Sequence, residues 1–216
     1  MNAYDILICG IGGQGAISLG TVLKLAAIHE GLDVVGAERR GGAQREGIVT
    51  SNVRYRRLEN GEMIDERRMA VSGLIPTGGA DMMISMEPVE ALRHARWLNE
   101  RSVVIVNDFP LTPVSVRTGE REYPSLETVY ARLREFTVNV HAFPIDRLSR
   151  LHFNSLRQVN TIALGMASAL GDLPVSDESI LAVVREQFPD FETNRSAFAL
   201  GKETAHGKGP VVPAHT

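Results

Sequence analysis

The stretch Asp5-Ile-Leu-Ile-Cys-Gly10-Ile-Gly-Gly-Gln-Gly15 decides which fold we expect of this chain. It begins with a short apolar run that ends at a glycine, which is typical of a buried parallel strand. From Ala16 to Glu30 the apolar residues recur at helical spacing, and Gly31 is a stop signal for that helix. The order of strand, glycine-rich loop and helix predicts an α/β domain with a Rossmann-like start.

The rest of the chain continues the alternation of strands and helices. Strands are expected at 32–37, 48–57, 80–85, 103–106 and 138–143, and helices at about 87–99, 126–136, 159–170, 176–188 and 191–205. Asn60-Gly61 is a tight-turn signal, so Met63-Ile64 is expected to start the second strand of an antiparallel hairpin. We therefore expect a single three-layer α/β domain over residues 1–205 with a largely parallel or mixed central sheet, and a flexible tail over residues 206–216.

Composition limits the kinds of partner. The chain has 216 residues, of which 44% are hydrophobic, and its formal net charge is -3 with a pI near 6.1. This balance gives no electrostatic reason to expect nucleic acid or an anionic membrane as partner. The start Met1-Asn-Ala-Tyr-Asp5 lacks the basic residues of a secretory signal, and no stretch approaches a membrane span, so a cytoplasmic protein is expected.

Cysteines and histidines also restrict the chemistry that this chain can carry. Cys9 is the only cysteine, so the chain cannot provide the four thiolates that usually hold an iron–sulfur cluster. Its place inside the first strand favours a buried structural thiol over a nucleophile. None of the six histidines has a partner at metal-ligand spacing, and no catalytic set can be singled out, so we predict neither a metal site nor a catalytic residue.

The glycine-rich loop is the main candidate for a binding site. Gly10, Gly12 and Gly15 satisfy the G-x-G-x-x-G pattern between a strand and a helix, where backbone N–H groups and the helix dipole attract an anion. Three interpretations remain open: a dinucleotide site, a phosphate site for another ligand, and a purely structural turn. Glu38, at the end of the second expected strand, is about where a dinucleotide site places its ribose-binding acid. Gly13 and Gln14 favour another ligand, since the Gln14 amide adds polar groups that pyrophosphate binding does not call for.

The loop and a second stretch, Glu38-Arg-Arg-Gly-Gly-Ala-Gln-Arg-Glu-Gly-Ile-Val-Thr-Ser-Asn-Val-Arg54, resemble the beta subunit of indolepyruvate ferredoxin oxidoreductase. That family belongs with the gamma subunits or domains of 2-oxoacid:ferredoxin oxidoreductases. Further matching stretches are Leu74-Ile-Pro76, Ala80-Asp81, Glu87-Pro-Val-Glu-Ala-Leu-Arg93, Asn160-Thr-Ile-Ala-Leu-Gly165 and Phe191-Glu-Thr-Asn-Arg-Ser-Ala-Phe198 with Gly201. The likeness spans about Asp5 to Gly201, in an order and spacing that are hard to match by chance.

The resemblance implies an oxidoreductase complex that acts on an oxo group and in which the chemistry belongs to partner chains. Thiamine diphosphate with Mg attacks the 2-oxoacid, here of the indolepyruvate or arylpyruvate type, carbon dioxide leaves, 4Fe–4S clusters take the electrons, and coenzyme A takes the acyl group. This chain would be a non-catalytic subunit of such a hetero-oligomer, packed on the larger catalytic subunit.

The resemblance also implies a shared coenzyme A site on this chain. The glycine loop, with Gly10, Gly12, Gly13, Gln14 and Gly15, would hold part of coenzyme A or an equivalent anion. The second stretch would contribute Glu38, Arg39, Arg40, Gln44 and Arg45, with the arginines neutralising the anion.

Some alternatives stay open at this point. The family's second loop usually reads Ser-Gln-Arg-Gly-Gly, whereas this chain has Ala43-Gln-Arg-Glu-Gly47, so Glu46 puts that contact in doubt. Gln44 and Arg45 suit either a clamp or a solvated salt bridge. Glu87 suits either an interface or a helix N-terminus, and Asn160 either a helix cap or an interface. A stand-alone dinucleotide- or flavin-binding oxidoreductase and a ligand-free scaffold are the alternative functions.

Overall fold

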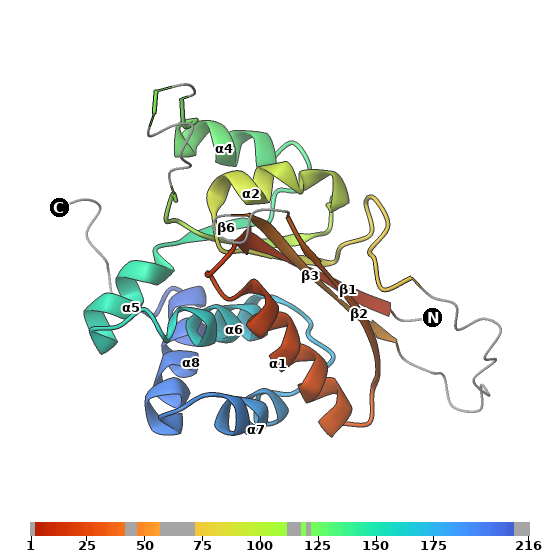
Figure 1. The fold of residues 1–216 in the computed structure, drawn as a ribbon, viewed down its shortest axis with the longest axis vertical. Helices are drawn as coiled ribbons and strands as arrows, with labels where there is room; N and C mark the ends of the chain where they lie inside the picture. Colours follow the sequence, from red (N-terminus) through yellow and green to blue (C-terminus); the bar gives the residue numbers. More distant parts are fainter. Residues whose placement is uncertain (1–2, 42–46, 57–71, 112–117, 120–121, 210–216) are drawn as a thin grey trace.

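The centre of the molecule is a six-stranded mixed sheet in the order β2-β3-β1-β4-β5-β6. The computed structural model describes residues 3–41, 47–56, 72–111, 118–119 and 122–209 (Figure 1). The strands are β1 (Ala3–Ile11), β2 (Asp33–Arg40), β3 (Ile48–Arg56), β4 (Met82–Ser85), β5 (Val103–Asn107) and β6 (Val140–Phe143). This mixed α/β architecture confirms the fold class expected from the sequence.

The strand β1 joins two differently built halves of the sheet. It pairs antiparallel with β3 over its whole length, and parallel with β4 from Ile6↔Met82 to Cys9↔Ser85. β3 in turn pairs antiparallel with β2, while β4, β5 and β6 continue in parallel. The Rossmann-like start therefore holds for strand, loop and helix only, because β3 lies between β1 and β2, which are neighbours in a Rossmann unit.

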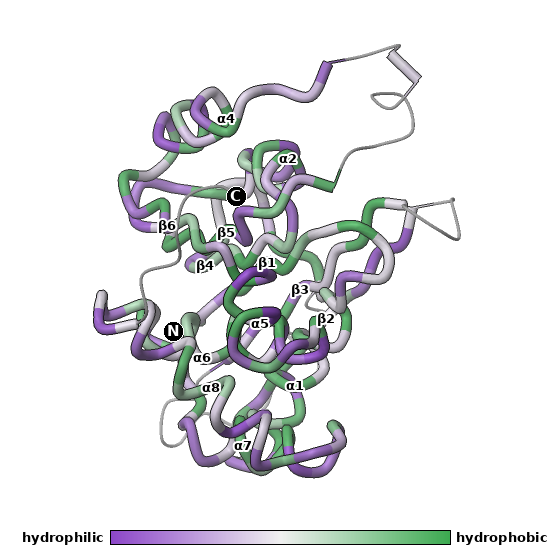
Figure 2. Tube along the Cα trace, turned by 90° about the vertical axis from the view of Figure 1, so that its left-hand side faces the viewer, coloured by the Kyte–Doolittle hydropathy of each residue, from purple (hydrophilic) through white to green (hydrophobic). Residues whose placement is uncertain are grey.

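Helices cover both faces of the sheet, as Figures 1 and 2 show from two sides. On one face lie α1 (Ala16–His29), α6 (Val159–Leu170), α7 (Asp177–Gln187) and α8 (Phe191–Ala205), and on the other lie α2 (Pro88–Arg93) and α4 (Leu126–Leu133). Since side chains of a strand alternate between faces, β1 serves two cores. Ile6 and Ile8 are buried against the first group of helices, and Leu7 and Cys9 against the second.

Two glycines allow α6 and α8 to cross at close range. A Cβ atom placed on Gly165 would lie 2.0 Å from the Phe198 carbonyl oxygen, and one on Gly201 would lie 2.1 Å from that of Ile162. Each glycine thus faces the backbone of the other helix. Gly165 and Gly201 therefore mark a tight helix crossing.

Several element boundaries differ from the sequence expectations. β2 extends to Arg40, so Glu38, Arg39 and Arg40 belong to a strand and not to a loop. The expected helix at 87–99 ends at Arg93, and the short 3₁₀ helix η1 (Ala95–Trp97) follows it. α5 (Ile145–Phe153) was not expected, because only a few buried residues, such as Ile145 and Leu148, mark its inner face.

Two further expectations from the sequence concern a hairpin turn and membrane-spanning segments. The turn expected at Asn60-Gly61 lies outside the described residues. None of the helices in the described ranges is long and apolar enough to cross a membrane.

Candidate functional site around the glycine loop

Backbone conformation and close packing favour glycine at two positions of the motif. Gly15 has a φ of 82°, and a Cβ there would meet the Asn160 side chain at 2.0 Å. A Cβ on Gly10 would lie 3.0 Å from both the Gln14 Oε1 and the Met86 Cβ. Gly13 has a φ of 97°, but no atom within 4 Å of its added Cβ. The structural-turn interpretation therefore explains Gly10 and Gly15, while the loop is open to its surroundings at Gly13.

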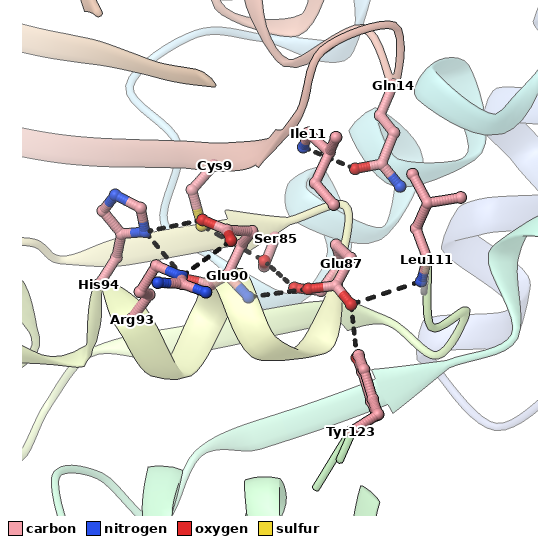
Figure 3. Close-up of polar contacts among 10 residues, drawn as sticks. All are labelled: Cys9, Ile11, Gln14, Ser85, Glu87, Glu90, Arg93, His94, Leu111 and Tyr123. Carbon is pink, nitrogen blue, oxygen red and sulfur yellow. Dashed lines mark hydrogen bonds and ion pairs between the residues drawn. The ribbon is translucent and has the colours of Figure 1, made fainter. Parts of the chain in front are cut away.

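Gln14 fastens the loop to the neighbouring strand. Its Oε1 accepts a hydrogen bond of 2.8 Å from the Ile11 N–H (Figure 3). Its Nε2 donates one of 2.9 Å to the Met86 carbonyl. Met86 follows β4 directly, so the side chain spans the carboxyl ends of β1 and β4. The sequence suggested that the amide adds donors beside an anion, whereas the structure shows that both of its polar atoms have partners within the fold.

Cavities lie on both sides of the loop and share Gly12, Gly13, Gly15 and Ser18. The first, which we call the Arg40 cavity, measures about 790 Å³ and extends to Arg40 and Val49. The second, the Asp146 cavity, measures about 580 Å³ and extends to Asn107, Asp146 and Arg157. An elongated ligand can therefore lie across the loop, with the loop backbone at its middle.

The loop presents unused hydrogen-bond donors to these cavities. The Gly12 N–H is bonded to the Gly47 carbonyl at 2.8 Å, and that of Gln14 to the Ile11 carbonyl at 3.1 Å. The N–H groups of Gly13, Gly15 and Ala16 have no acceptor among the described residues. Free N–H groups at the start of α1, combined with the helix dipole, favour a negatively charged group.

Asn107 and Asp146 form a buried polar pair in the Asp146 cavity. The Asn107 Nδ2 donates to the Asp146 Oδ1 at 2.7 Å, and the Asp146 N–H donates to the Asn107 Oδ1 at 3.3 Å. Burial raises the pKa of the Asp146 carboxyl above its usual range, and the Asn107 amide and Arg150 only partly oppose that rise. The sequence analysis missed this pair. Asn107 at the end of the strand expected at 103–106 was the one available signal.

The structure separates the residues that the sequence grouped with the loop. Arg40 lines the Arg40 cavity together with the loop, but Arg39 points to the opposite face of the sheet and lines another cavity. The Glu38 carboxylate is paired with Lys24 of α1 at 3.2 Å and with Arg40 at 3.9 Å. Gln44 and Arg45, like Glu46, lie outside the described residues.

Glu87 has the helix N-terminal role that the sequence allowed. Its Oε2 accepts the Glu90 N–H at 2.9 Å at the start of α2. Its Oε1 also accepts the Tyr123 hydroxyl and the Leu111 N–H, which tie the following segment to the helix (Figure 3). The side chain is 1% exposed, so its carboxylate is occupied inside the fold.

Asn160 is not the helix cap that the sequence allowed. The N-cap position of α6 is Gln158, and the Asn160 Nδ2 approaches the Gly15 carbonyl at 3.4 Å. Asn160 thus links the first turn of α6 to the glycine loop. This contact lies on the wall of the Asp146 cavity.

Comparisons with known proteins agree with these features. A family model described as pyruvate ferredoxin/flavodoxin oxidoreductase matches residues 5–204. The chain belongs to this family. Indolepyruvate oxidoreductase subunit IorB of Archaeoglobus fulgidus is 34% identical over 203 residues, covering 93% of this chain and 94% of that one.

Solved structures share the fold with this oxidoreductase chain. The gamma subunit of a keto/oxoacid ferredoxin oxidoreductase from Geobacter sulfurreducens is 24% identical, with a TM-score of 0.63 over 94% of this chain and 99% of that chain. The 2-oxoglutarate:ferredoxin oxidoreductase of Magnetococcus marinus, solved with 2-oxoglutarate, coenzyme A and succinyl-CoA bound, is 18% identical, with a TM-score of 0.66 over 96% of this chain and 32% of that chain. The resemblance seen in the sequence is confirmed, and the chain is an accessory subunit of the 2-oxoacid:ferredoxin oxidoreductase type.

Proposed function

We propose that this subunit binds the anionic part of coenzyme A at the glycine loop, in a complex whose larger subunit oxidatively decarboxylates an arylpyruvate. The observation that carries the proposal is the pair of cavities joined at the loop, where the N–H groups of Gly13, Gly15 and Ala16 are unused. Coenzyme A combines a diphosphate with a long amide-containing arm, so it suits an elongated site with an anion-binding centre.

The cofactors that carry out the chemistry are assigned to the larger subunit in this proposal. Thiamine diphosphate with Mg and the 4Fe–4S clusters would lie on the larger subunit and provide the decarboxylation and electron transfer. This chain has one cysteine, Cys9, which is buried in β1 and hydrogen-bonded to Ser85 at 3.3 Å, so it cannot serve as a cluster ligand set. The arylpyruvate substrate is proposed from the curated relative, whose name is indolepyruvate oxidoreductase subunit IorB.

Arg40 and Arg157 are the cations best placed to neutralise the anion. Arg40 lines the cavity on the β2 side of the loop, and Arg157 lines the cavity on the α6 side. Within the described part of the chain, the one ionic contact of Arg40 is a long one, of 3.9 Å, with Glu38. Its guanidinium therefore keeps donors available for a phosphate group.

The test is steady-state kinetics of the assembled complex with Arg40→Gln and Arg157→Gln. We expect the KM for coenzyme A to rise by roughly 3- to 30-fold in each variant, which corresponds to the loss of one charge-assisted hydrogen bond at a partly exposed site. The rate at which each variant complex reduces an electron acceptor before coenzyme A is added should equal that of the wild type. Arg132→Gln, on the outer face of α4, is the matched control.

Substitution of Gly13 is a less direct test, since its φ of 97° strains any side chain regardless of a ligand. An unchanged KM for coenzyme A in both arginine variants, with the complex intact, would contradict the proposal. The dinucleotide alternative is not favoured by the geometry, because Glu38 is paired with Lys24 and β3 separates its strand from β1.

A further inference from the structure

A third cavity lies on the sheet face opposite α1, and the coenzyme A proposal does not involve it. This Arg39 cavity measures about 510 Å³ and lies over β2 and β3, beside the end of α2, η1 and the segment Leu74–Ile75. In Figure 1, α2 covers the middle of that face and leaves the β2 and β3 side without a helix. Its volume falls in the range of small-molecule sites.

The lining of the Arg39 cavity is cationic. Arg39, Arg93 and Arg96 line it, and none of the described lining residues is a carboxylate. The Arg93 Nε is paired with the Oε1 of the buried Glu90 at 3.0 Å, so the charge of Arg93 is already balanced. Arg39 and Arg96 have no carboxylate partner among the described residues. Two guanidinium groups are therefore available for an anionic ligand.

The ring of Trp97 fixes the position of one of these cations. The guanidinium of Arg96 lies over the indole at 4.0 Å from the ring centroid, and His94 stacks on the same indole at 5.3 Å. The indole Nε1 donates to the Ile75 carbonyl at 3.0 Å, which anchors the ring. Burial lowers the pKa of His94, so the imidazole adds no charge at neutral pH. The positive charge of the cavity lining therefore comes from the arginines.

The floor and rim of the cavity are apolar. Leu74 is 53% exposed and Ile48 is 38% exposed, and both line the cavity together with the buried Leu7 and Ile75. Exposed aliphatic side chains beside unpaired guanidinium groups suit a ligand with an apolar body and one negative charge. Arg93 also lines the cavity, with its charge already paired to Glu90. Because guanidinium planes stack on aromatic rings, a flat aryl body beside Arg93 fits better than a flexible alkyl chain.

We propose that the Arg39 cavity is a binding site for an aryl carboxylate, with the carboxylate on Arg39 and Arg96 and the ring against Leu74 and Ile48. The site stands independently of the coenzyme A proposal, since the two use opposite faces of the sheet. Arg39 and Arg40 are adjacent in β2, so the alternation of the strand sends one arginine to each site.

Trp97 provides a direct probe, because it is the only tryptophan of the chain. The experiment titrates the full chain with phenylacetate, with 2-phenylethanol, which has the ring without the charge, and with hexanoate, which has the charge without the ring. We expect a saturable change in Trp97 fluorescence with phenylacetate, at an affinity at least about tenfold higher than with the other two. Equal affinity for all three, or no saturable change, would overturn the proposal.

Variants assign the binding to the cavity. Arg39→Gln and Leu74→Asn should each weaken phenylacetate binding by at least about fivefold, measured by calorimetry after circular dichroism has verified the fold, and Arg132→Gln should leave it unchanged. Wild-type affinity in Arg39→Gln would overturn the proposal. Coenzyme A added during the titration should not displace phenylacetate, whereas displacement would place both ligands at the glycine loop and remove the separate site.

Discussion

At the scale of single residues, the polar atoms around the glycine loop hold the fold together before any ligand arrives. The side chain of Gln14 joins the ends of β1 and β4, and the Asn107–Asp146 pair does the same for β5 and the start of α5. Buried polar groups are costly to leave without partners. The loop geometry therefore depends on residues that need not touch a ligand.

Gln14→Ala tests this role of the glutamine. The variant leaves the Ile11 N–H and one acceptor position of the Met86 carbonyl without partners, and we expect the free energy of unfolding to fall by about 1–3 kcal/mol. Urea denaturation of the purified chain measures the change. Gln187→Ala, at the exposed end of α7, is the control and should change stability by less than about 0.5 kcal/mol. Equal stability of both variants would show that Gln14 is not a clamp.

Asp146→Asn tests the buried carboxyl through its pH dependence. Because burial raises the folded pKa of Asp146 above its ordinary 3.8, the folded state binds more protons than the unfolded state in the interval between the two values. The stability that this group contributes is present below pH 3.8 and is lost as the pH rises through the folded pKa. The asparagine does not titrate, so the variant should gain stability relative to wild type, at up to about 1.4 kcal/mol per pH unit across that interval.

Chemical denaturation at a series of pH values measures that difference. Asp172→Asn, the same substitution at an exposed aspartate, is the matched control. A difference for Asp146→Asn that shrinks as the pH rises would contradict the proposed effect of burial.

At the scale of elements, the crossing of α6 and α8 is the tightest helix contact described. Gly165→Ala would put a methyl group onto the Phe198 carbonyl, and the two backbones would have to separate. We expect a loss of about 2–3 kcal/mol, as for overpacked cores, although alanine is the better helix former. Thermal unfolding with Glu203→Ala on the exposed side of α8 as control measures the loss. A stabilised Gly165→Ala variant would show that the crossing is more relaxed than the structure indicates.

Local sequence patterns predicted where these elements begin and end better than they predicted which elements lie side by side in the fold. The periodicity of 159–170 and 191–205 identified α6 and α8. The insertion of β3 between β1 and β2 could not be read from the sequence, because strand pairing depends on contacts far apart in the chain. The sequence did not predict that Arg39 and Arg40 lie on opposite faces of the sheet, because the strand was expected to end at Ala37. The strand, and with it the alternation of side chains between the faces, continues to Arg40.

The same limits apply to the site. The sequence grouped the glycine motif with Arg40, and the structure brings them together around one cavity. Asp146 was missed, since no helix was expected at 145–153 and the residue meets Asn107 only through the fold. Glu38 was expected in the site because a dinucleotide site has an acidic residue at about this position. Its pairing with Lys24 depends on the order of the strands in the sheet, which that comparison does not predict.

At the scale of the whole molecule, Cys9 reports on global opening. The thiol is 0% exposed in the central strand, and burial raises its pKa to about 12. We expect a thiol reagent to label the native chain at least about a thousandfold more slowly than the unfolded chain, with a rate that follows the unfolding equilibrium. Labelling in increasing urea, compared with loss of helical circular dichroism, measures this. Rapid labelling without urea would show that β1 is accessible by local opening.

The place of β1 in the sheet also has a consequence for biosynthesis. β1 leaves the ribosome before β3 and β4 and ends up between them, and its parallel partner β4 begins at Met82. Until that residue has been synthesised, the nascent chain can form only the antiparallel part with β2 and β3, and one edge of β1 stays without hydrogen-bonding partners. Chains dominated by such distant pairings fold slowly and expose strand edges meanwhile. Protection of the growing polypeptide by a chaperone should therefore matter most while the segment between β3 and β4 is being translated.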